Sequence, residues 1–283
     1  MQFYQRPEIL LEIPDNVEFI NDLSYTDSDL HSRQNLHLLK PKNITKKLPL
    51  IIYIHGGAWL HGDKDLQIPH LIPYVASGDF IAVALNYRFS QQAPWPAQID
   101  DCKTALSYLL KNSDKYGIDT EKVAIWGSSS GAHLSLHLVN DPRVHANVAY
   151  CAPSHFRPLL EVMKAEEHHL KSHGAADSPV IQLIGCNPLE NPQKLLAASP
   201  FEYISQDSCP TLLAHGTEDE AVPYGQSLAI KEKADSLGID FNLITLNGYK
   251  HKFSHPDLDE AVKNFFYYHL HGQGESSQDF KIN

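Results

Sequence analysis

A serine with glycines two residues before it and two residues after it is typical of a nucleophile on a sharp turn. The segment WGSSSGA carries three serines between two glycines. Only Ser129 has Gly127 and Gly131 at those two offsets, where a tight turn leaves no room for a Cβ atom. We therefore predict that Ser129 is the nucleophile, rather than Ser128 or Ser130.

This short pattern also arises by chance, because a small-residue turn that merely closes a loop has the same composition. A catalytic role requires a strand before the serine and a helix after it. Residues 123–127 form an apolar, strand-like run, and residues 132–138 have a helical composition. This context favours a nucleophile elbow, in which the serine projects above the carboxyl edge of a sheet.

Attack by a serine on an acyl carbon creates an oxyanion, which preoriented N–H groups must stabilise. The segment HGGAW follows the most apolar strand candidate, and its glycines let the backbone approach a substrate closely. Gly57 and Ala58 are predicted to donate two of these N–H groups. Ser130, at the start of the helix after the nucleophile, is predicted to donate a third.

A nucleophilic serine also needs a base, and the base needs an orienting acid. In folds that carry the nucleophile on such an elbow, the acid follows a later strand of the sheet and the histidine follows the last strand. Asp219 comes directly after the strand candidate 210–216, and His251 directly after 241–248, so we predict that they fill these two roles. Three residues of the same loops remain as alternatives, two as the acid and one as the base: Glu218, Glu220 and His255.

The elements that must position these residues alternate along the chain. The 283 residues are 42% apolar and 20% charged, which is enough to bury a large core. Continuous apolar runs indicate strands covered on both faces, as in parallel sheets. They lie at residues 48–57, 80–87, 123–127, 146–152, 210–216 and 241–248, with helical patterns at 97–117 and 261–272. The pattern predicts an α/β fold with a mostly parallel central sheet flanked by helices.

The whole chain, 1–283, is predicted to form a single domain without internal repeats. Residues 1–47 are predicted to contain two antiparallel strands. The stretch from about 154 to 208 breaks the alternation of strands and helices, and we expect it to form a small partial cap over the sheet.

Charge and composition argue against several functional classes. A net charge of −11 makes nucleic acid and anionic membranes poor partners. No apolar run approaches the roughly 18–20 residues that span a bilayer, and the first residues do not have the pattern of a signal peptide. The four cysteines are too irregularly spaced for a disulfide framework or a zinc site. We therefore expect reduced thiols and a cytoplasmic location, and a homodimer is left open.

Six segments, taken in order, resemble α/β-hydrolase esterases related to hormone-sensitive lipase, and most of all the small bacterial carbohydrate-ester and feruloyl esterases. They are HGGAW, LNYRFSQQAPWPAQIDD, KYGIDTEKVAIWGSSSGAHLS, SPFEYIS, HGTEDEAVPY and GYKHKF, within residues 49–271. The resemblance implies the α/β-hydrolase fold, hydrolysis of small carboxylic esters through an acyl-enzyme, and no metal or organic cofactor. It implies the same roles as above for Ser129, Asp219 and His251 and for the donors Gly57, Ala58 and Ser130.

The chain departs from the family pattern at the oxyanion loop. The family usually has HGGG, whereas here the third glycine is Ala58, whose N–H is kept if the backbone angle suits a Cβ atom. After the nucleophile, the hydroxyl of Ser130 either helps the oxyanion site or faces away from it. Trp59, Phe156 and Met163 are expected to line the substrate pocket.

Two further groups of charged residues and histidines stand out in the sequence. Glu218 and Glu220 flank the predicted acid Asp219, and Lys250 and Lys252 flank the predicted base His251. These opposite charges would pair and hold the two loops in register. The histidines at 169 and 173 have the spacing of a metal pair, but no third ligand is evident and a polar face is the simpler interpretation.

Two other functions are compatible with this pattern. A small-amide hydrolase such as an arylformamidase uses a similar glycine-aromatic loop. A catalytically silent binding module would normally have lost its nucleophile, whereas this chain has a residue at every position of the triad.

Overall fold

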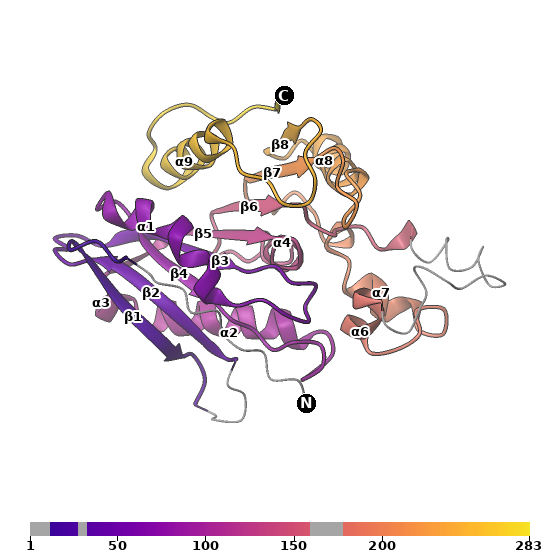
Figure 1. Ribbon diagram of the computed structural model, residues 1–283, viewed down its shortest axis with the longest axis horizontal. Helices are drawn as coiled ribbons and strands as arrows, with labels where there is room; N and C mark the ends of the chain where they lie inside the picture. Colours follow the sequence, from indigo (N-terminus) through magenta and orange to yellow (C-terminus); the bar gives the residue numbers. More distant parts are fainter. Residues whose placement is uncertain (1–11, 28–32, 159–177) are drawn as a thin grey trace.

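The computed structural model describes residues 12–27, 33–158 and 178–283. Within these ranges a single sheet of nine strands has the order β1-β2-β4-β3-β5-β6-β7-β8-β9 (Figure 1). The strands are β1 (Val17–Ser24), β2 (Asn35–Pro41), β3 (Leu48–Ile54), β4 (Ile81–Leu85), β5 (Ile118–Ser128), β6 (Ala146–Tyr150), β7 (Thr211–Gly216), β8 (Phe241–Leu246) and β9 (Phe280–Ile282).

The sheet is mostly parallel, as the continuous apolar runs predicted. From β4 through β3 and β5 to β9, every neighbouring pair of strands is parallel. Only β1 with β2 and β2 with β4 are antiparallel, in the N-terminal segment for which antiparallel strands were expected. The parallel strands therefore bring their carboxyl ends, and the loops that follow them, to one edge.

Helices cover both faces of the sheet. They are η1 (Lys64–Gln67), α1 (Ile68–Ala76), α2 (Ala97–Lys111), α3 (Ser113–Tyr116), α4 (Ser130–Leu136), α6 (Pro179–Ile184), α7 (Pro192–Ala197), η2 (Pro200–Glu202), α8 (Gly225–Leu237) and α9 (Pro256–His271). Buried side chains of α1 and α9 share one hydrophobic cluster, and those of α2, α4 and α8 share the other. Neighbouring residues of β3 alternate between the two clusters, because successive strand side chains point to opposite faces.

Several elements differ from the sequence prediction, among them α8, which was not predicted. The helical pattern at 97–117 is divided at Asn112 into α2 and α3, and Gly117 ends α3 with φ 79°. Helix α1 was not predicted, because Pro69 and Pro73 interrupt its pattern. Strand β9 was not predicted either, because it has only three residues and no apolar run around it. His251 therefore follows β8, and not the last strand as predicted.

The stretch predicted as a cap lies only partly within the described residues. Its helices α6 and α7 lie on the side of the sheet toward which β5, β6 and β7 point (Figure 1). Residues 159–177, which include Met163 and the histidine pair, lie outside the described residues. Of the helices that the structure describes, none combines the length and apolarity needed to cross a membrane.

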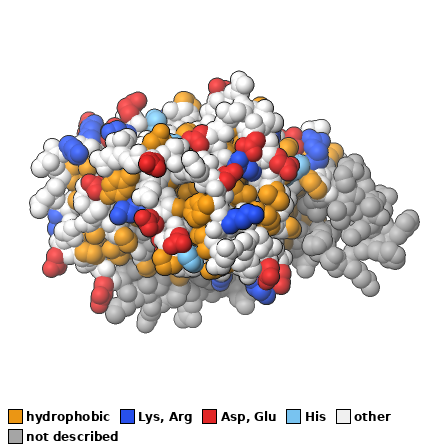
Figure 2. Space-filling model, turned by 90° about the horizontal axis from the view of Figure 1, so that it is seen from above, with side chains coloured by type: hydrophobic (Ala, Val, Ile, Leu, Met, Phe, Trp, Pro, Cys, Tyr) orange, Lys and Arg blue, Asp and Glu red, His pale blue; other side chains and the backbone are white. Residues whose placement is uncertain are grey.

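The described surface mixes charges of both signs. On the face seen in Figure 2, acidic side chains and Lys and Arg side chains are interspersed. A cavity of about 520 Å³ lies between α1 and α9 over Trp126. It therefore belongs to the face opposite α4.

Candidate active site

Ser129 lies on the turn between β5, which ends at Ser128, and α4, which begins at Ser130. Its backbone has φ 53° and ψ −121°, a region that is costly for any residue with a Cβ atom. Two hydrogen bonds hold the turn: the Ser129 N–H donates to Tyr150 O at 2.7 Å, and the His133 N–H donates to Ser129 O at 3.0 Å. The surrounding structure therefore maintains a strained turn at this residue.

The two glycines flanking Ser129 are required by crowding. A Cβ atom on Gly127 would lie 2.3 Å from Gly131 O, and one on Gly131 would lie 2.0 Å from Ile54 O at the end of β3. Real Cβ atoms do not approach backbone oxygens this closely. The elbow can therefore pack against the neighbouring strand only when both positions are glycine.

Gly131→Ala is expected to lower the free energy of unfolding by about 3 kcal/mol, because β3 or α4 must shift to admit the methyl group. Urea unfolding followed by circular dichroism measures the change. Gly225→Ala is the matched control, since a Cβ atom there meets nothing within 4 Å. Equal midpoints for the two variants would contradict the steric argument.

Each of the three adjacent serines has a different partner. Ser129 Oγ lies 3.0 Å from His251 Nε2. The Ser130 hydroxyl donates to Tyr87 Oη at 3.3 Å, since the Tyr87 hydroxyl itself donates to His55 O. The Ser128 side chain instead interacts with the Tyr53 hydroxyl. Only Ser129 thus faces a group that can accept its proton, and the Ser130 hydroxyl is engaged by a buried tyrosine.

His251 connects Ser129 to Asp219. Its Nδ1–H donates to Asp219 Oδ2 at 2.7 Å, while the other ring nitrogen faces the serine. The Asp219 side chain is fully buried, whereas Glu218 and Glu220 are exposed. His255 instead caps α9, where its Nδ1 accepts from the Asp257 N–H at 3.2 Å. The structure therefore brings together the three residues chosen from the sequence and none of their alternatives.

Backbone N–H groups hold the other oxygen of Asp219. Ala221 and Val222 both donate to Oδ1 at 2.9 Å. Burial alone would raise the pKa of Asp219, but the N–H groups of Val222, His251 and Ala221 outweigh that effect and keep the pKa below its ordinary value. The carboxyl group is therefore ionised, and its orientation is set from both sides.

The loop after β3 lies directly against the nucleophile. A Cβ atom on Gly56 would lie 3.1 Å from Ser129 Cβ. Gly57, Ala58 and Trp59 follow with φ values of 128°, 53° and 59°. Among the residues that the structure describes, no acceptor lies within hydrogen-bond range of the N–H groups of Gly57, Ala58 and Ser130. These three donors are thus available to an oxygen atom bound at the site.

Ala58→Gly is expected to keep hydrolytic activity within about twofold, and not to destabilise the fold, because it relieves a left-handed Cβ-bearing residue that costs about 1 kcal/mol. At an ordinary helical position, the same change lowers stability by about 1 kcal/mol. Ala229→Gly within α8 is therefore the control. Comparable losses of thermal stability in both variants would argue against strain at Ala58.

A buried polar network that was not predicted from the sequence supports this loop. His55 Nδ1–H donates to Gly56 O at 2.7 Å, and His55 Nε2 accepts from Arg33 Nη2 at 3.1 Å. Burial lowers the pKa of His55 to about 3, so the ring is neutral. Arg33 also donates to Gly62 O and pairs with Asp63 at 3.3 Å. The only available signal was the histidine of HGGAW, because Arg33 lies far away in the sequence.

The residues predicted to line the pocket are largely inside the protein. Trp59 is 2% exposed and Phe156 is 4% exposed, with their rings edge to face at 6.4 Å. Their side chains therefore offer little surface to a substrate. Met163 lies outside the described residues.

One of the predicted charge pairs between the acid and base loops is present. Lys250 Nζ lies 3.3 Å from Glu220 Oε1, with the two side chains 67% and 82% exposed. Such exposed pairs contribute little to stability, because solvent screens them and both side chains must be ordered.

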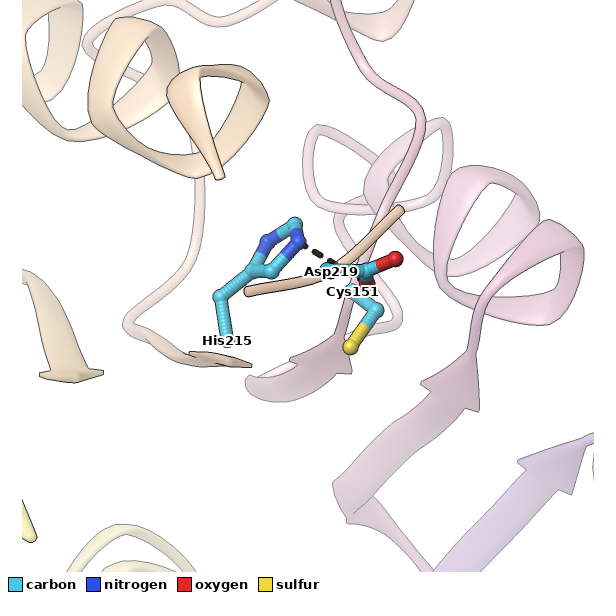
Figure 3. Close-up of side chains that lie close together, drawn as sticks. All are labelled: Cys151, His215 and Asp219. Carbon is cyan, nitrogen blue, oxygen red and sulfur yellow. Dashed lines mark ion pairs between the residues drawn. The ribbon is translucent and has the colours of Figure 1, made fainter. Parts of the chain in front are cut away.

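A cysteine, a histidine and the buried acid lie together beside the triad (Figure 3). Ligand atoms of Cys151, His215 and Asp219 lie within 4.8 Å of one another. However, His215 Nε2 lies 2.9 Å from Val222 O, which can only accept, so this nitrogen carries a proton and cannot ligate a metal. Its distance of 3.2 Å to Asp219 Oδ2 instead places a neutral imidazole beside the carboxylate. The cluster therefore fits packing around the acid better than a metal site.

Comparisons with known proteins agree with this geometry. The BD-FAE family model matches residues 36–234. Two relatives from Mycobacterium tuberculosis are similar in sequence. The probable carboxylic ester hydrolase LipM is 31% identical over 73% of this chain and 49% of LipM, and the esterase LipQ is 30% identical over 68% and 47%. The chain thus spans about half the length of these curated relatives.

A solved structure is similar along nearly its whole length. It is described as a truncated carbohydrate esterase from gut microbiota, with a TM-score of 0.78 and 26% identity over 90% of this chain and 96% of that one. The fold is therefore that of the α/β-hydrolase esterases, as the resemblance in the sequence implied. Since the family model covers well over half of its residues, this chain belongs to the BD-FAE family.

Proposed function

We propose that this protein is a serine carboxylesterase that hydrolyses small carboxylic esters through an acyl-enzyme. The observation that carries the proposal is the continuous line from Ser129 Oγ through His251 to Asp219, with distances of 3.0 and 2.7 Å. The N–H groups of Gly57 and Ala58, which have no acceptor among the described residues, lie in the loop packed against that serine. A nucleophile, a base, an oriented acid and oxyanion donors are the set that acyl transfer requires.

The mechanism follows from which atoms face one another. His251 Nε2 takes the proton of Ser129 as Oγ attacks the ester carbon, and the N–H groups of Gly57, Ala58 and Ser130 stabilise the resulting oxyanion. The same imidazolium then protonates the departing alcohol. Water, deprotonated by His251, hydrolyses the acyl-enzyme and regenerates the serine. Asp219 accepts the Nδ1–H throughout, which fixes the ring tautomer and stabilises its charged form.

The names of the similar proteins support an ester as the substrate. LipM and LipQ are described as ester hydrolases, and the similar structure as a carbohydrate esterase. We propose that short acyl esters of small soluble alcohols, sugars included, are the substrate class. The cytoplasmic location remains a prediction from the sequence, which leaves the homodimer open.

The test measures hydrolysis of p-nitrophenyl acetate, p-nitrophenyl butyrate, an acetylated sugar, a feruloyl ester and N-formylkynurenine by the full chain. Ser129→Ala is expected to lower ester hydrolysis by at least about 1,000-fold. Ser128→Ala is the control and should keep the activity, since this neighbouring serine faces Tyr53 rather than His251. Ester hydrolysis that survives in Ser129→Ala would refute the proposal, and preferential cleavage of N-formylkynurenine would instead indicate a small-amide hydrolase.

A further inference from the structure

The indole of Trp59 is hydrogen-bonded to the helix that carries the nucleophile. Trp59 is the last of the three loop residues with positive φ, and its Nε1–H donates to His133 Nδ1 at 3.3 Å. His133 lies on α4, four residues after Ser129, and both side chains are almost completely buried. This bond joins the loop that supplies the oxyanion donors to the element that begins at the nucleophile.

The partners of His133 allow only one tautomer of its ring. Its Nε2 lies 2.6 Å from Ala198 O, which can only accept, so Nε2 carries the proton. Its Nδ1 faces the indole N–H, which can only donate, so Nδ1 carries the lone pair. Burial keeps the pKa of His133 well below its ordinary value, so the neutral ring that this arrangement requires is maintained.

His133 also contacts the nucleophile turn through its backbone. Its N–H donates to Ser129 O at 3.0 Å, while its ring is stacked on Phe156 with centroids 5.4 Å apart. One residue therefore bonds the serine turn with its main chain and the oxyanion loop with its side chain. Both segments have backbone angles that persist only where the surroundings impose them.

We infer that His133 is a positioning residue that, through its hydrogen bond to Trp59, orients the oxyanion loop relative to Ser129. The inference rests on the proposed function, because it concerns how the site of ester hydrolysis is assembled. Without the bond, Gly57 and Ala58 lose a constraint on their left-handed backbone, and their N–H groups no longer converge on the oxyanion. Misplacement of about 1 Å at such a site lowers the rate by about 100-fold.

Trp59→Phe tests this step, because it keeps an aromatic ring in the core and removes the donor. We expect kcat to fall by about 10- to 100-fold with KM nearly unchanged. The inhibition constant of a trifluoromethyl ketone, which adds to Ser129 as a tetrahedral oxyanion, should rise in parallel. Active sites are first titrated with a phosphonate inhibitor, and kcat is calculated per active site. A smaller fraction of folded protein then does not lower the measured kcat.

Two other variants separate positioning from packing. His133→Gln keeps one acceptor and one donor and is expected to retain most of the activity, whereas His133→Leu should match Trp59→Phe. Trp95→Phe is the control, since its ring also packs on His133, at 5.4 Å, without a hydrogen bond to that side chain. Wild-type kcat in Trp59→Phe, or equal losses in Trp59→Phe and Trp95→Phe, would overturn the inference.

A measurement without substrate distinguishes failure of this inference from failure of the proposed function. In ¹⁵N NMR spectra of the wild-type protein, His133 should be protonated on Nε2 alone, and the Trp59 indole N–H should be protected from exchange. His133→Leu should remove that protection, while His133→Gln should keep it. If wild-type protein hydrolyses no ester but gives these spectra, the function fails and the hydrogen bond stands. Protonation of His133 on Nδ1 would refute the inference whatever the activity.

Discussion

Ser129→Gly is expected to abolish ester hydrolysis and, at the same time, to give a more stable protein than Ser129→Ala. Both variants lack the nucleophile, so kcat should fall by about 10⁶-fold in each. They differ in the backbone, because φ 53° and ψ −121° suit glycine and strain alanine. Relief of this strain outweighs the greater entropy of the unfolded glycine chain and leaves a gain of about 1 kcal/mol.

Thermal unfolding of the two variants in the same buffer measures this difference. For a chain of this size, 1 kcal/mol corresponds to about 2 °C or slightly more in the melting midpoint. A glycine variant that melts at or below the alanine variant would contradict stored strain at the elbow. Hydrolysis retained by either variant would contradict the role of Ser129.

Asp219→Asn is expected to lower kcat by about 10⁴-fold, although it changes one oxygen into an amide nitrogen. Both oxygens of Asp219 accept from N–H groups: Oδ1 from Ala221 and Val222, and Oδ2 from His251. An asparagine must therefore turn its NH₂ group toward another donor. If the NH₂ group faces Nδ1 of His251, the proton of the imidazole moves to Nε2. This nitrogen can then no longer take the proton of Ser129.

The same substitution should lower the free energy of unfolding at neutral pH by about 1–3 kcal/mol, because it leaves buried donors unpaired. This loss of unfolding free energy should depend on pH. The pKa of Asp219 is lower in the folded than in the unfolded chain, so its charge stabilises the fold above about pH 4, the ordinary carboxyl value. That contribution is lost as the pH falls through the lower folded pKa, where the two proteins should converge in stability.

Glu220→Gln is the matched control for Asp219→Asn, because this neighbouring acid is exposed and, within the described part of the chain, pairs only with Lys250. It should leave kcat and stability unchanged. A comparable loss of kcat in both variants would show that the charge of the loop matters rather than the buried carboxylate. Denaturant unfolding at pH 7 and pH 3, together with steady-state kinetics, measures both effects.

Local sterics and chain order were enough to predict the main features of the site. Gly127 and Gly131 select Ser129 among three serines, because a tight turn excludes Cβ atoms at those offsets, and the structure has backbone oxygens at 2.3 and 2.0 Å from where they would lie. The apolar runs predicted the strands, since a strand buried on both faces has no polar alternation. Short or proline-containing elements such as β9 and α1 lack such a signal and were not predicted.

Choices among neighbouring residues were decided only by the tertiary structure. The sequence by itself determined that the acid and the base lie in the loops after β7 and β8, but Glu218, Asp219 and Glu220 have similar composition around them. Burial singles out Asp219, because that loop packs two backbone N–H groups against its carboxylate and leaves its neighbours in solvent. The choice of His251 also depends on the tertiary structure, since this residue lies 122 residues from its serine partner. The same is true of His133, whose side chain bonds Trp59 and Ala198 from two distant segments. Residue patterns report on local geometry, whereas a hydrogen bond between distant segments depends on how the whole sheet brings them together.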